Sequence, residues 1–256
     1  MTEINEYKKF AAHLAGLSGK FINKHFRTAI SIETKSDNSP VTIADKGAEE
    51  IIRKKIMSEY PDHGIIGEEF GNHNETSQYN WILDPIDGTK SFISGIATFG
   101  TLIGLLKDRV PILGLFHQPI IDELLIGDNQ STELNGTKAK VRSCEGIEKA
   151  TLLTSDHFMI GNYKNQISFD RLANKVKLYR TWGDCFGYYL LSTGYADIMV
   201  DPIMSPWDAL PLIPILKGAG GTVTDYEGND PVKGNSIVAA ESSIHSQVIK
   251  ILNVDK

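Results

Sequence analysis

The chain has 256 residues, of which 41% are hydrophobic and 23% are charged, and this composition excludes a disordered protein. A formal net charge of −6 argues against nonspecific binding to nucleic acid or to an anionic membrane surface. The two cysteines have no paired-thiol or zinc-ligand spacing, and residues 1–9 are too polar for a signal peptide, so we expect a cytoplasmic protein.

The first part of the sequence predicts two helices. Apolar residues recur at spacings of three and four over residues 7–22, which predicts a long amphipathic helix packed as an outer layer. After a turn-rich loop at residues 35–40, Thr42 and Asp45 form a pattern that begins helices, and apolar residues then continue along one face. From this pattern alone, Lys35 is most simply a surface lysine and Asp45 an acid at the start of a helix.

A short buried strand is predicted next, running from residue 64 into Glu68 and Glu69. Adjacent side chains on a strand point to opposite faces, so only one of the two glutamates can face a site. We expect Glu68 to be the inward one, although the pattern itself leaves the choice open. Residues 72–80 are predicted to be a polar connector.

The central motif follows a strand predicted at residues 81–83. Pro85 cannot continue the hydrogen-bond ladder of that strand, so the chain is expected to turn there and to aim Asp84 and Asp87 at one point. A helix beginning at Gly88 or Thr89 would direct its N–H groups at the same point, where a phosphate could bind. An Asx-type turn that caps an ordinary helix would satisfy this pattern too.

The remaining sequence predicts strands alternating with helices. Strands are predicted at residues 99–106, 112–119, 123–127, 150–154, 177–181, 196–201, 222–226 and 236–240. Helices are predicted at residues 168–176, 184–193, 209–217 and 243–252. Turns are predicted at residues 107–111 and 134–137. The turn at residues 107–111 breaks the longest apolar region, which is therefore not a membrane span. This alternation indicates a layered, mixed α/β fold.

Four acids stand where a strand ends or a helix begins: Glu68, Asp84, Asp87 and Asp208. Layered α/β folds place functional groups at such positions. At ~4 to 5 Å and an effective dielectric constant near 20, each pair of like charges costs roughly 3 to 4 kcal/mol, so a converging set needs cations or protons. Oxygen ligands without His or Cys select hard ions, Mg²⁺ first. Asp208 also fits a plain helix start, and Asp184 a plain N-cap.

The sequence resembles the inositol monophosphatase family in four motifs that occur in the family's order and spacing. They are VTIAD at residues 41–45, GEE at 67–69, WILDPIDGTKSF at 81–92, and PWDA at 206–209 with AGG at 219–221. The resemblance covers essentially the whole chain. It implies a five-layer α/β/α/β/α sandwich that commonly forms a homodimer. It also implies a metal- and phosphate-binding half at residues 1–145, joined to a substrate-recognition half at residues 146–256.

The resemblance also implies two to three Mg²⁺ ions per site. The first would be bound by Glu68, Asp84 and Asp87 with the carbonyl of Ile86, and the second by Asp84, Asp87 and Asp208. Lithium, which inhibits this family by taking a metal position, is expected to inhibit this protein.

The same resemblance assigns the remaining catalytic groups. Asp45 with Glu68 would hold a weaker third ion, and the Thr89 hydroxyl would lie near a water of the first. The N–H groups of Gly88 and Thr89 would hold the phosphate. The implied reaction is hydrolysis of a phosphate monoester by a metal-activated water, without a covalent intermediate.

Substrate selection is expected in the second half, from Arg180, Gly183, Asp184, Asp201 and Asp208. Polyol-selective relatives carry a run of small residues where this chain has Gly183-Asp184-Cys185-Phe186, and Glu where it has Asp201. A carboxylate beside the leaving group favours a cationic organic part, such as an amine with an imidazole.

The stretch at residues 180–188 looks most like the histidinol-phosphate phosphatases of the family, which act in histidine biosynthesis. Inositol-1-monophosphatase, or another sugar monophosphatase or bisphosphatase, is the alternative. A non-catalytic binding or regulatory protein is a distant one, because every expected metal ligand is kept.

Overall fold

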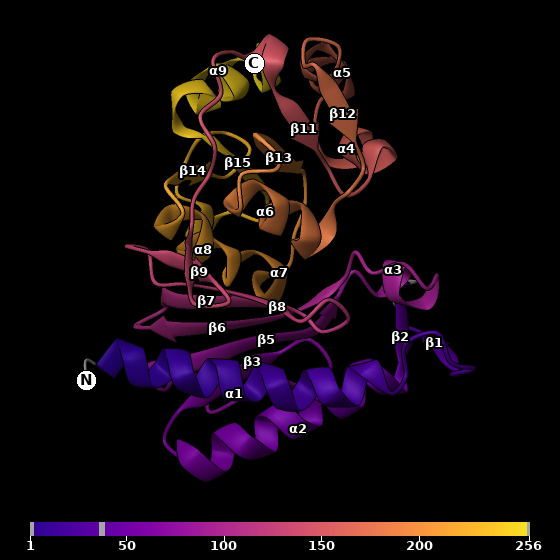
Figure 1. The fold of residues 1–256 in the computed structure, drawn as a ribbon, viewed down its shortest axis with the longest axis vertical. Coiled ribbons are helices and arrows are strands. Elements are labelled where there is room, and N and C mark those ends of the chain that lie inside the picture. Colours follow the sequence, from indigo (N-terminus) through magenta and orange to yellow (C-terminus); the bar gives the residue numbers. More distant parts are fainter. Residues whose placement is uncertain (1–2, 36–38, 255–256) are drawn as a thin grey trace.

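The computed structural model describes residues 3–35 and 39–254, and it has five layers (Figure 1). Helices α1 (Glu3–Asn23) and α2 (Ile43–Glu59) form the first layer, and an eight-stranded sheet forms the second. Three short helices lie between this sheet and a five-stranded sheet, whose far face is covered by three more. The predicted α/β/α/β/α sandwich is therefore confirmed.

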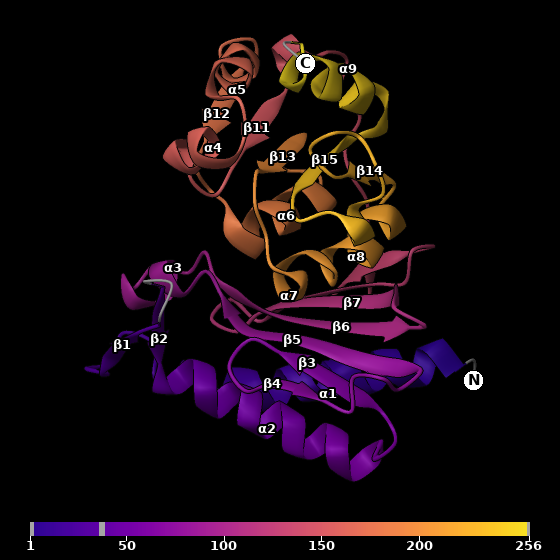
Figure 2. The same cartoon turned by 180° about the vertical axis from the view of Figure 1, so that it is seen from behind.

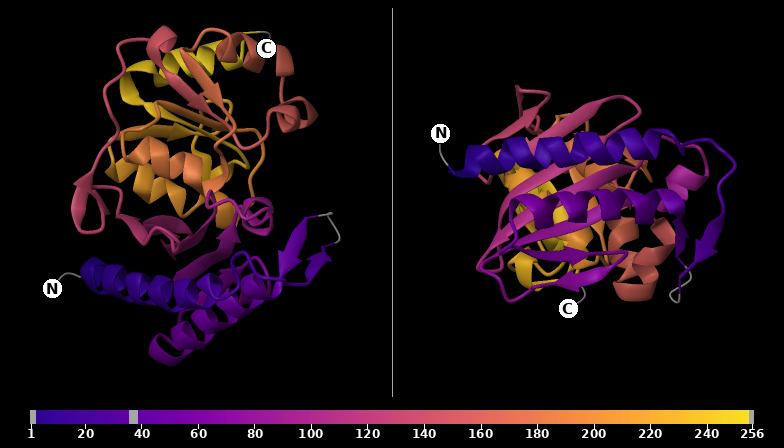
Figure 3. Two further views of the ribbon diagram at one scale, coloured as in Figure 1. Left: turned by 45° about the vertical axis from the view of Figure 1, so that its right-hand side comes forward. Right: turned by 90° about the horizontal axis from the view of Figure 1, so that it is seen from below.

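Both helices of the first layer were predicted, and they lie side by side across the outer face of the large sheet (Figure 3). Helix α2 begins with a capping box in which Thr42 and Asp45 bond each other's backbone N–H groups, as expected. Strands β1 (Ile32–Thr34) and β2 (Pro40–Thr42) form a small hairpin. The predicted loop at residues 35–40 lies in part outside the described residues.

The large sheet has the strand order β10-β9-β8-β7-β6-β5-β3-β4. Its strands are β3 (Gly64–Gly67), β4 (Gly71–His73), β5 (Tyr79–Asp87), β6 (Gly100–Lys107), β7 (Val110–Gln118), β8 (Glu123–Gly127), β9 (Thr132–Leu134) and β10 (Thr137–Ala139). All neighbours are antiparallel except β3 and β5. The predicted connector at residues 72–80 was wrong in part, because β4 includes its first two residues and β5 its last two.

The smaller sheet has the order β12-β11-β13-β15-β14. Its strands are β11 (Thr151–Leu153), β12 (Leu178–Arg180), β13 (Ile198–Asp201), β14 (Gly221–Thr224) and β15 (Ile237–Glu241). The helices between the sheets are α6 (Asp184–Ser192), α7 (Pro206–Ala209) and α8 (Leu212–Gly218). The outer helices are α4 (His157–Tyr163), α5 (Gln166–Ala173) and α9 (Ser242–Leu252). A further short helix, α3 (Thr89–Ile93), follows β5, and Ile147–Lys149 and Pro231–Lys233 form single 3₁₀ turns.

Two helix predictions in the second half need correction. The single helix expected at residues 209–217 is divided into α7 and α8, because Pro211 has no N–H to continue the ladder and becomes the N-cap of α8. Helix α4 was not predicted, since its seven residues are too few to show a clear apolar period.

The layers are in close contact at the centre. A Cβ added to Gly114 of β7 would lie 1.8 Å from the carbonyl oxygen of Pro211, so the α7–α8 segment rests directly on the sheet backbone. Figure 2 shows α6, α7 and α8 filling the space between the two sheets. Consequently the ends of β5, α6 and α7 meet in one place. No helix in the described part of the chain is long and apolar enough to cross a bilayer.

Candidate active site

The two acids of the central motif converge because of a bulge in β5. Asp84 pairs with Leu102 of β6 but Asp87 pairs with Gly100, so β5 has one extra residue between the two pairs. In a regular strand, side chains three positions apart point to opposite faces, and the extra residue returns Asp87 to the face of Asp84. The strand was predicted to end at a turn at Pro85. It continues to Asp87 instead, and the carbonyl of Pro85 accepts a hydrogen bond from Thr101 at 2.8 Å.

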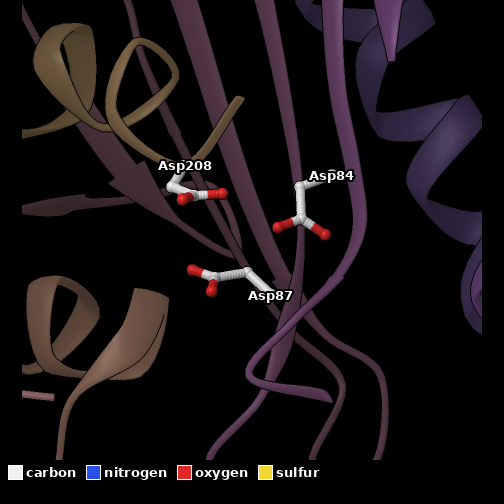
Figure 4. A group of neighbouring side chains, drawn as sticks. All are labelled: Asp84, Asp87 and Asp208. Atoms are coloured by element: carbon white, nitrogen blue, oxygen red, sulfur yellow. The ribbon is translucent and has the colours of Figure 1, made fainter. Parts of the chain in front are cut away.

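Asp208 reaches the same point from α7. Asp84, Asp87 and Asp208 each offer a carboxylate oxygen, and the three oxygens lie within 4.8 Å of one another (Figure 4). Asp208 Oδ2 accepts from the N–H of Ser205 at 2.9 Å and closes a capping box. Asp208 is thus a helix-start residue and a member of this acidic cluster at the same time.

The acidic cluster favours protons when no cation is bound. Burial raises the pKa of Asp84 and of Asp87 well above the ordinary value, and neighbouring carboxylates raise both further. Burial also raises the pKa of Asp208 to about 7, with a contribution from the charge of Glu68. The donors are carboxylate oxygens without His or Cys, so the cluster fits a hard divalent cation such as Mg²⁺.

Glu68 lies beside the cluster, but Glu68 and Glu69 do not point to opposite faces of a strand as predicted. Residues 68–70 form a turn after β3, so side chains need not alternate, and both glutamates contact the same lysine. Lys35 Nζ lies 2.7 Å from Glu68 Oε1 and 2.6 Å from Glu69 Oε1. Glu68 lines the same pocket as Asp84, whereas burial raises the pKa of Glu69 to about 7.

Thr89 connects the cluster to Asp45. Helix α3 begins at Thr89, with Gly88 as its N-cap at φ +88°, a conformation that favours glycine. The Thr89 hydroxyl lies 3.2 Å from Asp45 Oδ1 and 3.0 Å from the carbonyl oxygen of Ile86, so it can donate to either. Burial raises the pKa of Asp45. The structure thus brings all the residues expected at the metals into one region.

Two adjoining pockets open at this region. The first, of about 420 Å³, contains the acidic cluster; it is lined by Lys35, Ser39, Pro40, Glu68, Asp84, Ile86, Asp87, Gly88, Thr89, Lys90, Asp184, Ser205, Trp207 and Asp208. The second, of about 320 Å³, is lined by Asp87, Lys90, Ser91, Thr98, Ser155, Asp156, Met159, Thr181, Gly183, Asp184, Asp201, Ile203, Met204 and Asp208. Asp87, Lys90, Asp184 and Asp208 belong to both linings.

Asp184 is not the N-cap of α6. It is the first residue of that helix, at φ +51°, and the N-cap is Gly183, which has no side chain to cap with. The cap is supplied from the other half of the chain, because the Cys185 N–H donates to Asp87 Oδ2 at 2.8 Å. Burial raises the pKa of Asp184 to about 6, and the charge of Asp201 adds to this rise.

Of the other residues expected to bind substrate, Asp201 and Gly183 lie at the second pocket and Arg180 does not. Arg180 is exposed on β12 and lines neither pocket, so the structure does not bring it to the site. Asp201 lines the second pocket, but its two oxygens accept hydrogen bonds from the Ser155 N–H and the Tyr188 hydroxyl, each at 2.9 Å. A Cβ on Gly183 would lie 2.1 Å from Ser155 Cα, so Gly183 is required for close packing.

Several pocket residues were missed. Lys90 faces both pockets, and its place directly after Thr89 in the motif was an available signal. Asp156 and Met159 come from the start of α4, a helix that was itself unpredicted. Met204 comes from the loop before α7, and no sequence pattern marked it.

Comparisons with known proteins agree with this geometry. A sequence model of the inositol monophosphatase family matches residues 3–254. The bifunctional phosphatase IMPL2 of Arabidopsis thaliana, a chloroplastic protein, is 40% identical over 98% of this chain and 76% of its own length. A histidinol-phosphatase of Chlorobaculum parvum is 36% identical over 94% of both chains.

Solved structures show the same fold. An inositol monophosphatase from Zymomonas mobilis superimposes with a TM-score of 0.88 and 33% sequence identity, covering 98% of this chain and 99% of its own. The suhB protein of Bartonella henselae superimposes with a TM-score of 0.91 at 24% identity, which is a likeness of fold alone.

Proposed function

The chain belongs to the inositol monophosphatase family, and we propose that it is the member that hydrolyses histidinol phosphate, with Mg²⁺ as its cofactor. Membership makes it a phosphatase, and phosphatases of this family act on small phosphorylated substrates. The choice of substrate rests on one observation. The pocket that adjoins the acidic cluster is itself lined by carboxylates, with Asp184 at the junction.

The charge of the second pocket favours a cationic leaving group. Besides Asp87 and Asp208 of the acidic cluster, three aspartates line it, Asp156, Asp184 and Asp201, and Lys90 is the one lysine or arginine in its described lining. Histidinol carries an ammonium group and an imidazole, both of which are attracted by carboxylates, whereas inositol is neutral. Two curated relatives called histidinol-phosphatase, from Chlorobaculum parvum and Mycobacterium tuberculosis, match at 36% and 32% identity.

For the metals, we propose that Asp84, Asp87 and Asp208 hold two Mg²⁺ ions, with Glu68 and the Ile86 carbonyl completing one site. A weaker third ion would lie at Asp45 and Glu68. When bound, such ions lower the pKa of water and neutralise the charge that develops on the leaving oxygen.

The chain's own groups complete the reaction scheme. In this proposal the N–H groups of Gly88 and Thr89 hold the phosphate in line with the attacking water. Glu68 accepts a proton from that water. When the Thr89 hydroxyl donates to Asp45 Oδ1, its lone pairs are directed away from Asp45 and can orient the water. The leaving oxygen takes a proton from solvent water, Glu68 returns its proton to solvent, and the product alcohol leaves through the second pocket.

The deciding experiment compares kcat/KM for L-histidinol phosphate and for inositol 1-phosphate, by phosphate release with Mg²⁺ and again with EDTA. We expect the first value to be at least tenfold larger, an order set by one charged contact, and EDTA to abolish both activities. A larger value for inositol 1-phosphate would overturn the assignment. That outcome is the alternative favoured by the 33% identical Zymomonas structure.

Assembly and location remain part of the proposal. We propose a homodimer in the cytoplasm, on the strength of family membership. Light scattering coupled to size-exclusion chromatography would test the dimer, and a monomer at micromolar concentration would contradict it.

A further inference from the structure

The second pocket has an inner and an outer carboxylate. Asp184 lines both pockets and so lies at the junction with the acidic cluster. Asp156 lines the second pocket alone, on the segment before α4. A substrate whose phosphate lies in the first pocket therefore meets Asp184 first and Asp156 farther along.

Ser155 holds these two carboxylates in a fixed relation. Its hydroxyl accepts the N–H of Asp184 at 2.7 Å, and its own N–H donates to Asp201 at 2.9 Å. The contact stabilises Asp184 at φ +51°, which is uncommon for a residue with a side chain. Asp156 is the next residue after Ser155. Because Ser155 also binds the backbone of Asp184, it fixes how far apart Asp156 and Asp184 lie.

Asp156 has one oxygen engaged and one available. Its Oδ1 accepts from the N–H groups of Phe158 at 2.9 Å and Met159 at 3.3 Å, which caps α4. Within residues 3–35 and 39–254, no donor contacts its Oδ2. A ligand N–H can bind this second oxygen without breaking the cap.

The pocket that Asp156 lines also has apolar side chains, two of which are flexible methionines. Met159, Ile203 and Met204 line the same pocket. Thioethers make favourable contacts with aromatic rings, and they are only weak acceptors for the hydroxyl groups of a sugar ring. A flat ring with an N–H at its edge suits this combination of an apolar wall and one carboxylate.

Resting on the proposed function, we infer that Asp156 is a specificity-determining residue that binds the ring nitrogen of the leaving group, while Asp184 binds its ammonium. The order of the acids matches the order of groups in histidinol phosphate. The ammonium stands on the carbon next to the phosphorylated CH₂, and the imidazole is one further CH₂ away. The site would therefore bind two nitrogen groups that lie at different distances from the phosphate.

The test uses three esters: histidinol phosphate, alaninol phosphate, which keeps the ammonium but lacks the ring, and imidazolylpropanol phosphate, which keeps the ring but lacks the amine. For Asp156→Asn we expect the ratio of kcat/KM for histidinol phosphate to that for alaninol phosphate to fall about three- to tenfold, the range for a partly exposed charged contact. Asp184→Asn should lower kcat/KM for both amine-bearing esters and leave that ratio within about twofold.

Controls separate this inference from folding and from the proposed function. Asn caps helices as well as Asp, so Asp156→Asn should unfold at the wild-type temperature. Asp230→Asn, a matched change at another N-cap that lies outside both pockets, should not move the ratio. If wild type hydrolyses histidinol phosphate but Asp156→Asn leaves the ratio unchanged, or lowers kcat/KM for all three esters equally, the inference is wrong and the proposed function stands. If wild type prefers inositol 1-phosphate to all three esters, both the inference and the proposed function are wrong.

Discussion

Replacing Asp87 by Asn tests the acidic cluster most directly, because it removes one charge at almost constant shape. The carboxylate oxygens of Asp84, Asp87 and Asp208 lie within 4.8 Å of one another. At that distance and an effective dielectric constant near 20, each ionised pair repels by about 3.5 kcal/mol. The raised pKa values mean that protons already relieve part of this repulsion at neutral pH. We therefore expect metal-free Asp87→Asn to be more stable than wild type by roughly 1 to 3 kcal/mol.

The assay is thermal unfolding at about pH 8, where the repulsion is largest, with EDTA and then with Mg²⁺. For a chain of this length the gain corresponds to a rise in Tm of about 2 to 10 °C without metal. Mg²⁺ should raise the Tm of wild type and have little effect on the variant, and kcat should fall by several orders of magnitude. The Asn side-chain carbonyl can still accept the Cys185 N–H, so α6 keeps its cap.

Asp122→Asn is the matched control, since it removes the same charge from a fully exposed side chain; its carboxylate lies 3.9 Å from His117, whose pKa is lowered by burial, so that imidazole is uncharged at about pH 8. This control should behave as wild type in both assays, which excludes an effect of net charge. Near-wild-type turnover of Asp87→Asn, or a metal-free Tm at or below that of wild type, would refute the reasoning. Isothermal titration with Mg²⁺ gives an independent measure of the lost binding.

The remaining predictions use pH, specificity and lithium. Because the pKa of Asp208 is raised from 3.8 to about 7, the stability it contributes is fully present below the lower value and is lost as pH rises through the higher one. Metal-free wild type should therefore melt at a lower temperature at about pH 8 than at about pH 5.5, and saturating Mg²⁺ should remove most of the difference; equal Tm values without metal would contradict this. Asp184→Asn should lower kcat/KM for histidinol phosphate by about ten- to a hundredfold and leave a neutral polyol phosphate unchanged or improved. An unchanged ratio of the two values would count against a substrate contact. Li⁺ should inhibit in competition with Mg²⁺ in steady-state kinetics, and no inhibition at tens of millimolar, an order set by weak hard-ion affinity, would argue against the second metal site.

Predictions that rest on local patterns held well. The long apolar period of α1 and the capping box of Thr42 and Asp45 depend only on residues near in sequence, so they could be identified without the fold. The turn at residues 134–137 is of the same kind, because Asn135 and Gly136 adopt the positive φ values that short hairpins need. The motif around Asp84 marked Asp84 and Asp87, the two acids of the cluster that lie close together in sequence.

Features that depend on distant partners were missed or misjudged. The bulge that turns Asp87 towards Asp84 is defined by pairing with β6, and no pattern within β5 reveals it. The cap of α6 comes from a side chain 98 positions away, so a helix-start acid was given that role instead. Arg180 was expected at the site because it begins the stretch at residues 180–188 that looks like the histidinol-phosphate phosphatases. Its side chain on β12 is instead exposed to solvent. For the bulge and for the cap of α6, the deciding contact joins segments that are remote in sequence.

Asp87 joins the acidic cluster to the start of α6, so the proposed metal site and the proposed substrate pocket form one unit. One of its oxygens belongs to the acidic cluster, and its Oδ2 accepts the N–H of Cys185 at the start of α6. The residue before Cys185 is Asp184, which faces the junction of the two pockets. A cation at the cluster would be attracted to the same carboxylate that fixes the start of α6. Since that carboxylate comes from β5 of the large sheet and α6 belongs to the second half of the chain, the start of α6 depends on a residue of the first half. In the proposed function, side chains around α6 can therefore be altered to change the substrate, while the contact to Asp87 keeps α6 aligned with the proposed phosphate site.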